Sequence, residues 1–208
     1  MEQSSPPSVP QDPRRQATGI AAAAPWLVSG LLFAITAAAL RFEGQPWSCA
    51  SEDWSPWISD VWTSHCSQHL FDPYSITHVS HGLIFYGVLW LVARRMKMGW
   101  RFCIAIAIAA AWEILENSPF IINRYRNVTM SLEYLGDSVI NALGDVASCG
   151  IGFVLARWMG WRWALALFVA TEVLLLVLIK DNLTLNVIML VWPLQAIKDW
   201  QMVGHAPG

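Results

Sequence analysis

One uninterrupted apolar run, from Ile20 to Leu40, constrains the fold of this chain more than any other feature. The run is 21 residues long and contains no charged side chain. A helix rises about 1.5 Å per residue, so a helix of this length crosses the roughly 30 Å hydrocarbon core of a bilayer. The run therefore predicts a transmembrane helix.

The composition agrees with a membrane environment. Hydrophobic residues make up 55% of the chain and charged residues 13%, which is about half the charged share of an average soluble protein. The formal net charge of -2 leaves no basic surplus for binding nucleic acid. We therefore expect membrane lipid, and no nucleic acid, as a partner, while the oligomeric state stays open.

Further apolar stretches indicate a multi-pass protein. A last stretch, 183–197, is shorter and contains Pro193, so it either crosses at a tilt or lies on the membrane surface. The predicted fold class is all-α, a multi-pass transmembrane helical bundle of five or six spans. The four spans that follow the first are expected at His81–Ala93, Phe102–Ile122, Val139–Trp158 and Trp163–Ile179.

The sequence predicts one transmembrane domain with a tail at each end. Residues 1–18 are rich in Pro, Ser and Gln, which predicts a disordered cytoplasmic tail because little apolar surface is available to bury. Residues 19–200 form a single transmembrane domain with an outer loop at 41–77, and 201–208 form a second tail. A cleaved secretory signal is the alternative for the first span, although that span is longer than a signal core.

Basic residues predict the orientation. They gather on the cytoplasmic side of membrane proteins, and here they gather before the first span, between the second and third spans, and between the fourth and fifth. The amino terminus is therefore expected in the cytoplasm. The outer loop then lies in an oxidising compartment, so its two cysteines, Cys49 and Cys66, are expected to form a disulfide.

Polar residues converge at the outer ends of three spans. Two histidines begin the second span, two glutamates end the third, and an acid, an amide and an acid repeat every four residues at the start of the fourth. An ionisable group inside a membrane helix costs about 2.5 to 3.5 kcal/mol, so the deepest acid, Asp145, needs compensation. The residues are His78, His81, Glu113, Glu116, Asp137, Asn141 and Asp145.

Three interpretations of this group stay open. The residues bind a divalent metal such as Zn, Mn or Fe, with His78, His81, Glu113 and Glu116 as ligands. Alternatively they join the helices by hydrogen bonds, or they form a proton or solute path, for which Glu172 in the fifth span is the best further member.

Arginines near the site suggest an anionic ligand. Arg124 and Arg126 carry forked donors suited to phosphate, so they are candidates to grip a lipid head group. In the metal interpretation, Asp137 acts as ligand or general base, and Asn141 with Asp145 completes the pocket.

Four stretches carry a family resemblance: SQHLFDPYSITHVSHGLIFYG, WEILENSPFIINRYR, YLGDSVINALGDV and DNLTLNVIMLVWPL. They resemble the signature blocks of Domain of Unknown Function 2585, a family of uncharacterised bacterial inner-membrane proteins. The resemblance implies a multi-pass protein of the bacterial inner membrane and implies no activity. A fainter likeness is to VanZ-like membrane proteins, through Glu116, Arg126, Asp137, Asn141 and Gly144, and it implies a role in the cell envelope.

The sequence thus favours a periplasm-facing pocket of His, Glu and Asp that holds a divalent metal and acts on an envelope lipid or lipid-linked phosphate. The alternative is a non-catalytic membrane protein that binds a lipid, a partner or a proton through the same polar network.

Overall fold

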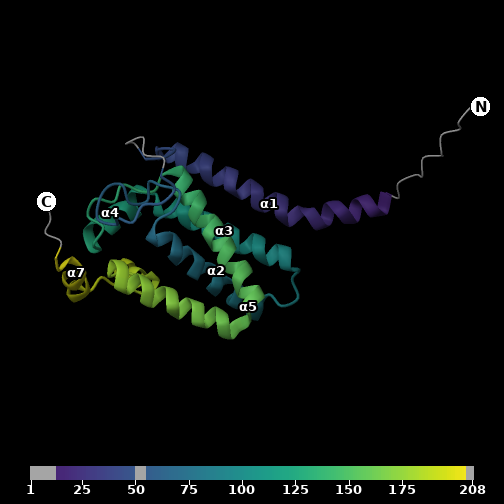
Figure 1. Ribbon diagram of the computed structural model, residues 1–208. Helices are drawn as coiled ribbons and strands as arrows, with labels where there is room; N and C mark the ends of the chain where they lie inside the picture. The colour runs from purple at the N-terminus through teal and green to yellow at the C-terminus, as the bar shows by residue number, and fades with distance from the viewer. Residues whose placement is uncertain (1–12, 50–54, 205–208) are drawn as a thin grey trace, which may run out of the picture.

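The computed structural model describes residues 13–49 and 55–204, and these residues form helices and loops without a strand (Figure 1). Three short helices, α4, α6 and α7, gather at one end of the long ones. The helices are α1 (Pro13–Glu43), α2 (Pro73–Val92), α3 (Met98–Glu116), α4 (Pro119–Val128), α5 (Val139–Ile179), α6 (Leu183–Val191) and α7 (Gln195–Met202).

The fold is organised around α2, which packs against both halves of α5. A Cβ atom added to Gly82 would lie 2.0 Å from the backbone oxygen of Cys149, and one added to Gly152 would lie 2.0 Å from that of Val79. The two helices therefore touch backbone to backbone where glycines face each other, as small residues permit in membranes. On its other side, α2 meets the second half of α5 through the hydroxyls of Ser80 and Thr171, 2.9 Å apart.

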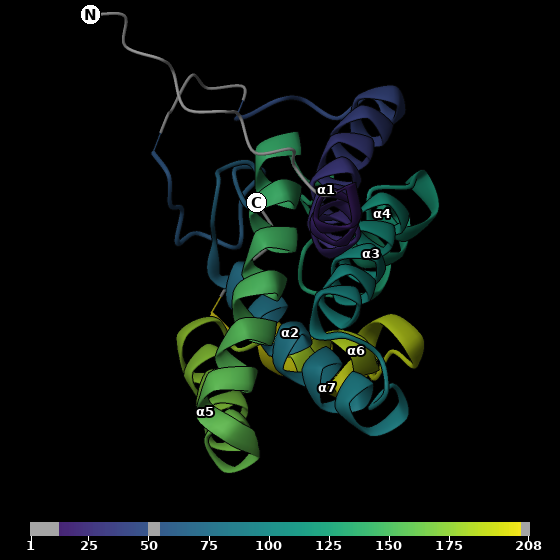
Figure 2. The same cartoon turned by 90° about the vertical axis from the view of Figure 1, so that its right-hand side faces the viewer.

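The two halves of α5 are joined at Gly160, whose backbone leaves the helical region (φ 74°, ψ 167°). Glycine adopts a positive φ without the steric cost of a Cβ atom. The chain therefore turns there, and the second half runs back beside α2 (Figures 1 and 2). The expected fourth and fifth spans correspond to these two halves.

Within the described residues, four helices, α1, α2, α3 and α5, are long and apolar enough to cross a membrane. The count of five or six spans stays a prediction. The second span starts earlier than expected, because Asp72 caps α2 and Pro73 occupies its first turn, a position that favours proline. The third ends earlier than expected, because Ser118 and Pro119 begin the separate helix α4.

The stretch at 183–197 is not one span. Helix α6 has nine residues, so it is about 14 Å long and too short to cross alone. Pro193 follows it and lies outside any helix, and α7 begins at Gln195. Proline lacks the N–H that would continue the helix, which explains the break.

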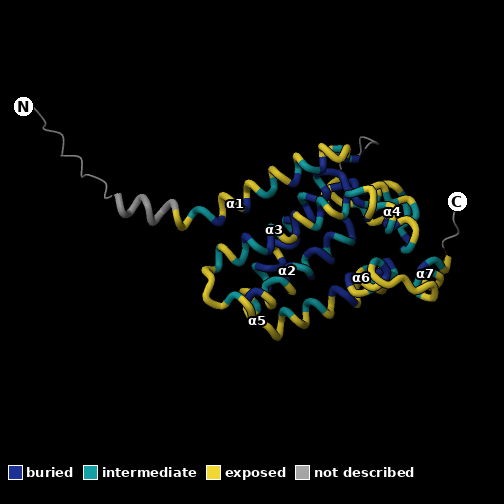
Figure 3. The backbone as a smooth tube through the Cα atoms, turned by 180° about the vertical axis from the view of Figure 1, so that it is seen from behind, coloured by how far each residue is buried: buried dark blue, intermediate teal, exposed yellow. Residues whose placement is uncertain are grey.

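The outer surface of the bundle is apolar, as expected of a membrane protein. Figure 3 shows exposed segments along α1 and along the second half of α5, with the buried residues gathered around α2. Trp158, Trp161 and Trp163, near the Gly160 turn, are 78%, 71% and 68% exposed. Exposed tryptophans at the ends of spans are typical of the membrane interface.

The ends of the chain differ in part from the expected tails. Helix α1 begins at Pro13, so residues 13–18 of the expected disordered tail are helical, and residues 1–12 lie outside the described part. Proline suits a first helical turn, and the Arg, Gln and Ala that follow favour helix. At the other end α7 continues to Met202, and residues 205–208 are not described.

The prediction of a Cys49–Cys66 disulfide is wrong. Neither cysteine takes part in a disulfide. Cys49 Sγ lies 3.2 Å from His65 Nδ1 instead, and Cys66 Sγ lies 3.8 Å from Ser67 Oγ. The prediction rested only on the presence of two cysteines in the same outer loop. It could not show that the loop brings His65, and not Cys66, next to Cys49.

Candidate functional site

His78 lies between two carboxylates from two other helices. Its Nδ1 is 3.3 Å from Glu113 Oε1 of α3, and its Nε2 is 3.9 Å from Asp145 Oδ2 of α5. All three residues are buried, with Glu113 fully inaccessible. The histidine of α2 is thus the point where three helices bring their polar groups together, as the sequence predicted.

The acids around His78 are not fully satisfied. Both side-chain oxygens of Glu113, and Oδ1 of Asp145, are buried without a hydrogen-bond partner in the described part of the chain. Within that same part, no Lys or Arg forms an ion pair with either acid. A buried carboxylate without compensation is costly, so a proton, a cation or a bound water would stabilise these oxygens.

A ligand set for a cation is present. His78, Glu113 and Glu116 each offer one ligand atom, and these atoms lie within 4.8 Å of one another. Glu113 and Glu116 are one helical turn apart at the end of α3, which places both on one face. Imidazole with carboxylate is a donor set that suits Zn, Mn or Fe.

His81, predicted as a fourth ligand, is not in this set. Its ring contacts that of His78 edge to face, with centroids 5.2 Å apart, and stacks on Phe85 at 5.8 Å. It is half-buried and lines the cavity described below. One helical turn from His78, it lines the same cavity but offers no ligand atom to this set.

Asp137 lies just before α5 and not on it, because Ser138 is the helix cap. Its carboxylate accepts hydrogen bonds from Asn117 Nδ2 at 2.8 Å and from the Tyr134 hydroxyl at 3.0 Å. Burial raises the pKa of Asp137 to about 6, against the lowering effect of these two donors. Asn117 and Tyr134 were not predicted, since no spacing in the sequence links them to Asp137.

Asn141 holds the outer loop against α5 through hydrogen bonds of its side chain. Its Nδ2 donates to the backbone oxygen of His69 at 2.7 Å and lies 3.5 Å from Asp72 Oδ2. Asp72 itself accepts from the backbone N–H groups of Ser67, Tyr74 and Ser75. Burial raises the pKa of Asp72. Asn141 thus ties the outer loop to α5 at the start of α2.

The two predicted phosphate-binding arginines are not brought into the cluster. Arg124 Nε donates to the Leu190 backbone oxygen at 2.9 Å, which joins α4 to α6. Arg126 is exposed, and its Nε donates to the Leu132 backbone oxygen at 3.3 Å. Neither is among the described residues that line the cavity. Their assignment to phosphate stays a prediction.

A cavity of about 200 Å³ opens beside the cluster. One part of its wall is polar, including His78, Glu116 and Asp145, and another part is the apolar face of α6. The outer loop also contributes to the wall, from Val61 to Ser67. Such a lining suits a ligand with a polar head and an apolar chain. The lining residues that come from α6 are Leu183, Asn186, Val187, Leu190 and Val191.

Comparisons with known proteins match the chain to a family whose description gives no activity. The family model described as "Protein of unknown function (DUF2585)" matches residues 40–203. A UPF0314 protein of Sphingopyxis alaskensis is 48% identical over 86% of this chain and 95% of its own length. UPF0314 proteins of Paracoccus denitrificans and Rhizobium meliloti are 44% and 41% identical, over 86% of this chain and 92% and 91% of theirs. No solved structure matches.

Proposed function

The chain belongs to the DUF2585 family, whose description names no activity, and we propose from its own residues that it is a membrane metalloprotein. In this proposal His78, Glu113 and Glu116 bind a divalent ion of the Zn, Mn or Fe class, and Asp145 faces the ion across His78. The single observation that carries the proposal is the pair of Glu113 oxygens, buried and without a hydrogen-bond partner among the described residues, beside two other ligand groups.

The charge of the cluster supports a cation. Glu113 and Asp145 are both buried next to one imidazole, and no Arg or Lys of the described chain pairs with them. A divalent ion offsets two carboxylates, whereas a protonated histidine offsets only one. The helices already hold the ligands, so binding requires small side-chain movements rather than refolding.

The cavity supports a substrate with a phosphate head and a lipid chain. A divalent ion at His78 and Glu116 would face the polar part of the wall, where it can orient a phosphate oxygen or activate water. Asp137, whose pKa is raised to about 6, lines that wall and serves as the general base in this proposal. The apolar face of α6 would then contact the lipid chain.

We place the site in the bacterial inner membrane, with the amino terminus in the cytoplasm and the cavity facing the periplasm. The distribution of basic residues in the sequence supports this orientation. An envelope lipid or a lipid-linked precursor is the substrate class that meets a cavity on that side.

Metal analysis of the purified protein tests the proposal. Protein carrying a tag without histidine should contain a stoichiometric divalent metal that a chelator removes. H78A and E113Q should lose it, while E133Q, which changes an exposed glutamate on the same cavity wall, should keep it. Native mass spectrometry should then show a polyprenyl phosphate bound only in the metal-loaded protein.

The opposite result has a definite meaning. A folded wild-type protein that takes up no divalent metal would refute the metal site. It would favour a non-catalytic protein that binds a lipid, a partner or a proton through the same polar network.

A further inference from the structure

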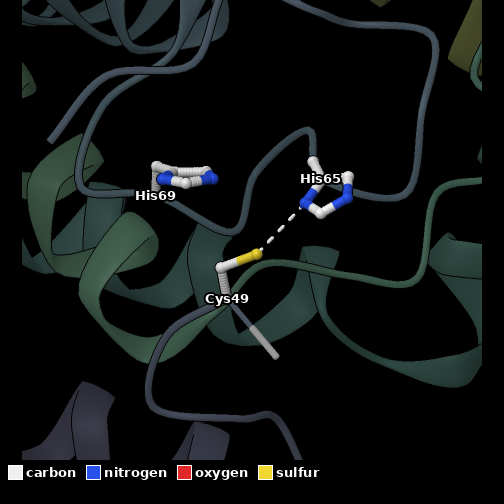
Figure 4. A group of neighbouring side chains, drawn as sticks. All are labelled: Cys49, His65 and His69. Atoms are coloured by element: carbon white, nitrogen blue, oxygen red, sulfur yellow. Dashed lines mark hydrogen bonds between the residues drawn. The ribbon is translucent and has the colours of Figure 1, made fainter. Parts of the chain in front are cut away.

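We propose a second metal site in the outer loop, formed by Cys49, His65 and His69, for a thiophilic ion of the zinc or copper class. Each residue offers one ligand atom, and these atoms lie within 4.8 Å of one another. Figure 4 shows the three side chains, with Cys49 and His65 in contact and the ring of His69 turned toward them. The site is separate from the His78 cluster and shares no residue with it.

The observation that points to a ligand is the state of His69. This side chain is 1% exposed, and its Nδ1 lies 2.8 Å from the Ser55 carbonyl oxygen. A carbonyl only accepts, so Nδ1 carries the proton and Nε2 carries a lone pair. That Nε2 is buried without a hydrogen-bond partner in the described chain. A histidine fixed by a carbonyl on one nitrogen and open on the other is the usual arrangement of a metal ligand.

The donor set selects the class of metal. One sulfur and two imidazoles suit zinc and copper, whereas calcium and magnesium prefer oxygen. Ligand distances of about 2.0 Å to nitrogen and 2.3 Å to sulfur require the three side chains to close slightly on the ion. Binding takes place through the thiolate, so the thiol proton is released to solvent.

The site has an open side. Cys49 and His69 are buried, but His65 is exposed. Three protein ligands leave a fourth position for water or for an external ligand. The ion therefore enters from solvent on the side of His65.

The consequence for the protein is a cross-link across the long outer loop. Cys49 follows the end of α1, while His65 and His69 precede α2, so one ion would close the loop that a disulfide was expected to close. The segment between His65 and His69 includes Cys66 and Ser67, which line the cavity. Metal binding at this site should therefore order part of the cavity wall.

Cobalt binding tests the proposal, because a thiolate bound to Co²⁺ gives a charge-transfer absorption band that nitrogen and oxygen ligands do not. Full-length protein without a histidine tag is treated with chelator and a phosphine reductant and then titrated with Co²⁺. We expect the band in the wild type, its loss in C49S, and at least a tenfold weaker affinity in H69A and H65A. C66S, which changes the other cysteine of the loop, should keep the band.

Two further measurements make the result decisive. H78A should leave the band unchanged, which separates this site from the one under the proposed function. Zinc should compete with cobalt and should slow proteolysis of the outer loop in the wild type but not in H69A. Folded wild-type protein without the band, or a band that survives in C49S, would overturn the proposal, as would a Cys49–Cys66 disulfide in protein as isolated from cells.

Discussion

Glu172, in the middle of the second half of α5, caps the start of α6 by accepting a hydrogen bond from the Leu183 N–H at 3.1 Å. Its other oxygen accepts from the Thr184 N–H at 3.0 Å, and the helix cap Asn182 accepts from Leu185. The first three N–H groups of α6 are thus satisfied by two side chains. These hydrogen bonds explain why a buried acid lies within this span, and the explanation does not need a proton path.

The cap gives a direct test of how α6 is held. E172Q removes the charge and leaves one oxygen where two accept hydrogen bonds, so it should lower the unfolding free energy by about 1.5 to 3 kcal/mol. Thermal unfolding in detergent measures the loss. E43Q, at an exposed glutamate of α1, should have little effect. If E172Q unfolds at the wild-type temperature, the cap does not hold α6.

The close approach of α2 and α5 predicts a severe effect from one methyl group. G152A would place a Cβ atom 2.0 Å from the Val79 backbone oxygen. Because this neighbour is a backbone atom of a packed helix, it cannot move aside as the end of a flexible side chain can. We expect a loss of about 3 kcal/mol or more in stability, seen as low yield of folded protein and a lower unfolding temperature. G87A, on α2 with nothing within 4 Å of its added Cβ, is the matched control and should behave like the wild type.

The pH dependence of stability should contain a contribution from Asp181, which lies between α5 and α6. Burial raises the pKa of its carboxyl to about 6, above its ordinary value of 3.8. An acid with a raised pKa in the folded state contributes stability below the unfolded pKa and loses it as pH rises through the folded one. About 3 kcal/mol should therefore be lost between pH 4 and about pH 7.

Denaturation across this pH range measures the contribution as a difference between variants. D181N cannot titrate, so its stability should fall less steeply than that of the wild type between pH 4 and 7. D199N, at an exposed aspartate of α7, should keep the wild-type slope. Equal slopes in D181N and the wild type would show that Asp181 does not titrate as described.

The sequence predicted the helical class, the main apolar segments and the meeting of His78, Glu113 and Asp145, because length, hydropathy and helical spacing determine them. It did not predict where α2 begins or where α3 ends. These boundaries depend on two short polar signals: Asp72 and Ser118, each followed by a proline, start helices α2 and α4. The hydropathy of the surrounding residues does not show either start.

The remaining site features depend on tertiary contacts between distant residues. Asn117 reaches Asp137 across the loop between α3 and α5, and Cys49 meets His65 rather than Cys66. Arg124 and Arg126, which lie between Glu116 and Asp137 in the chain, donate to backbone oxygens instead. The likeness to VanZ-like proteins, which includes Arg126, stays a prediction.

The most direct test of the metal site is to locate the ion. Crystals of protein loaded with Mn²⁺, or with Zn²⁺, should give an anomalous diffraction peak within about 2.5 Å of a nitrogen of His78 and of oxygens of Glu113 and Glu116. The peak should disappear in E113Q and remain in E133Q. A well-ordered His78 cluster without an anomalous peak, in crystals that contain the metal in excess, would contradict the account.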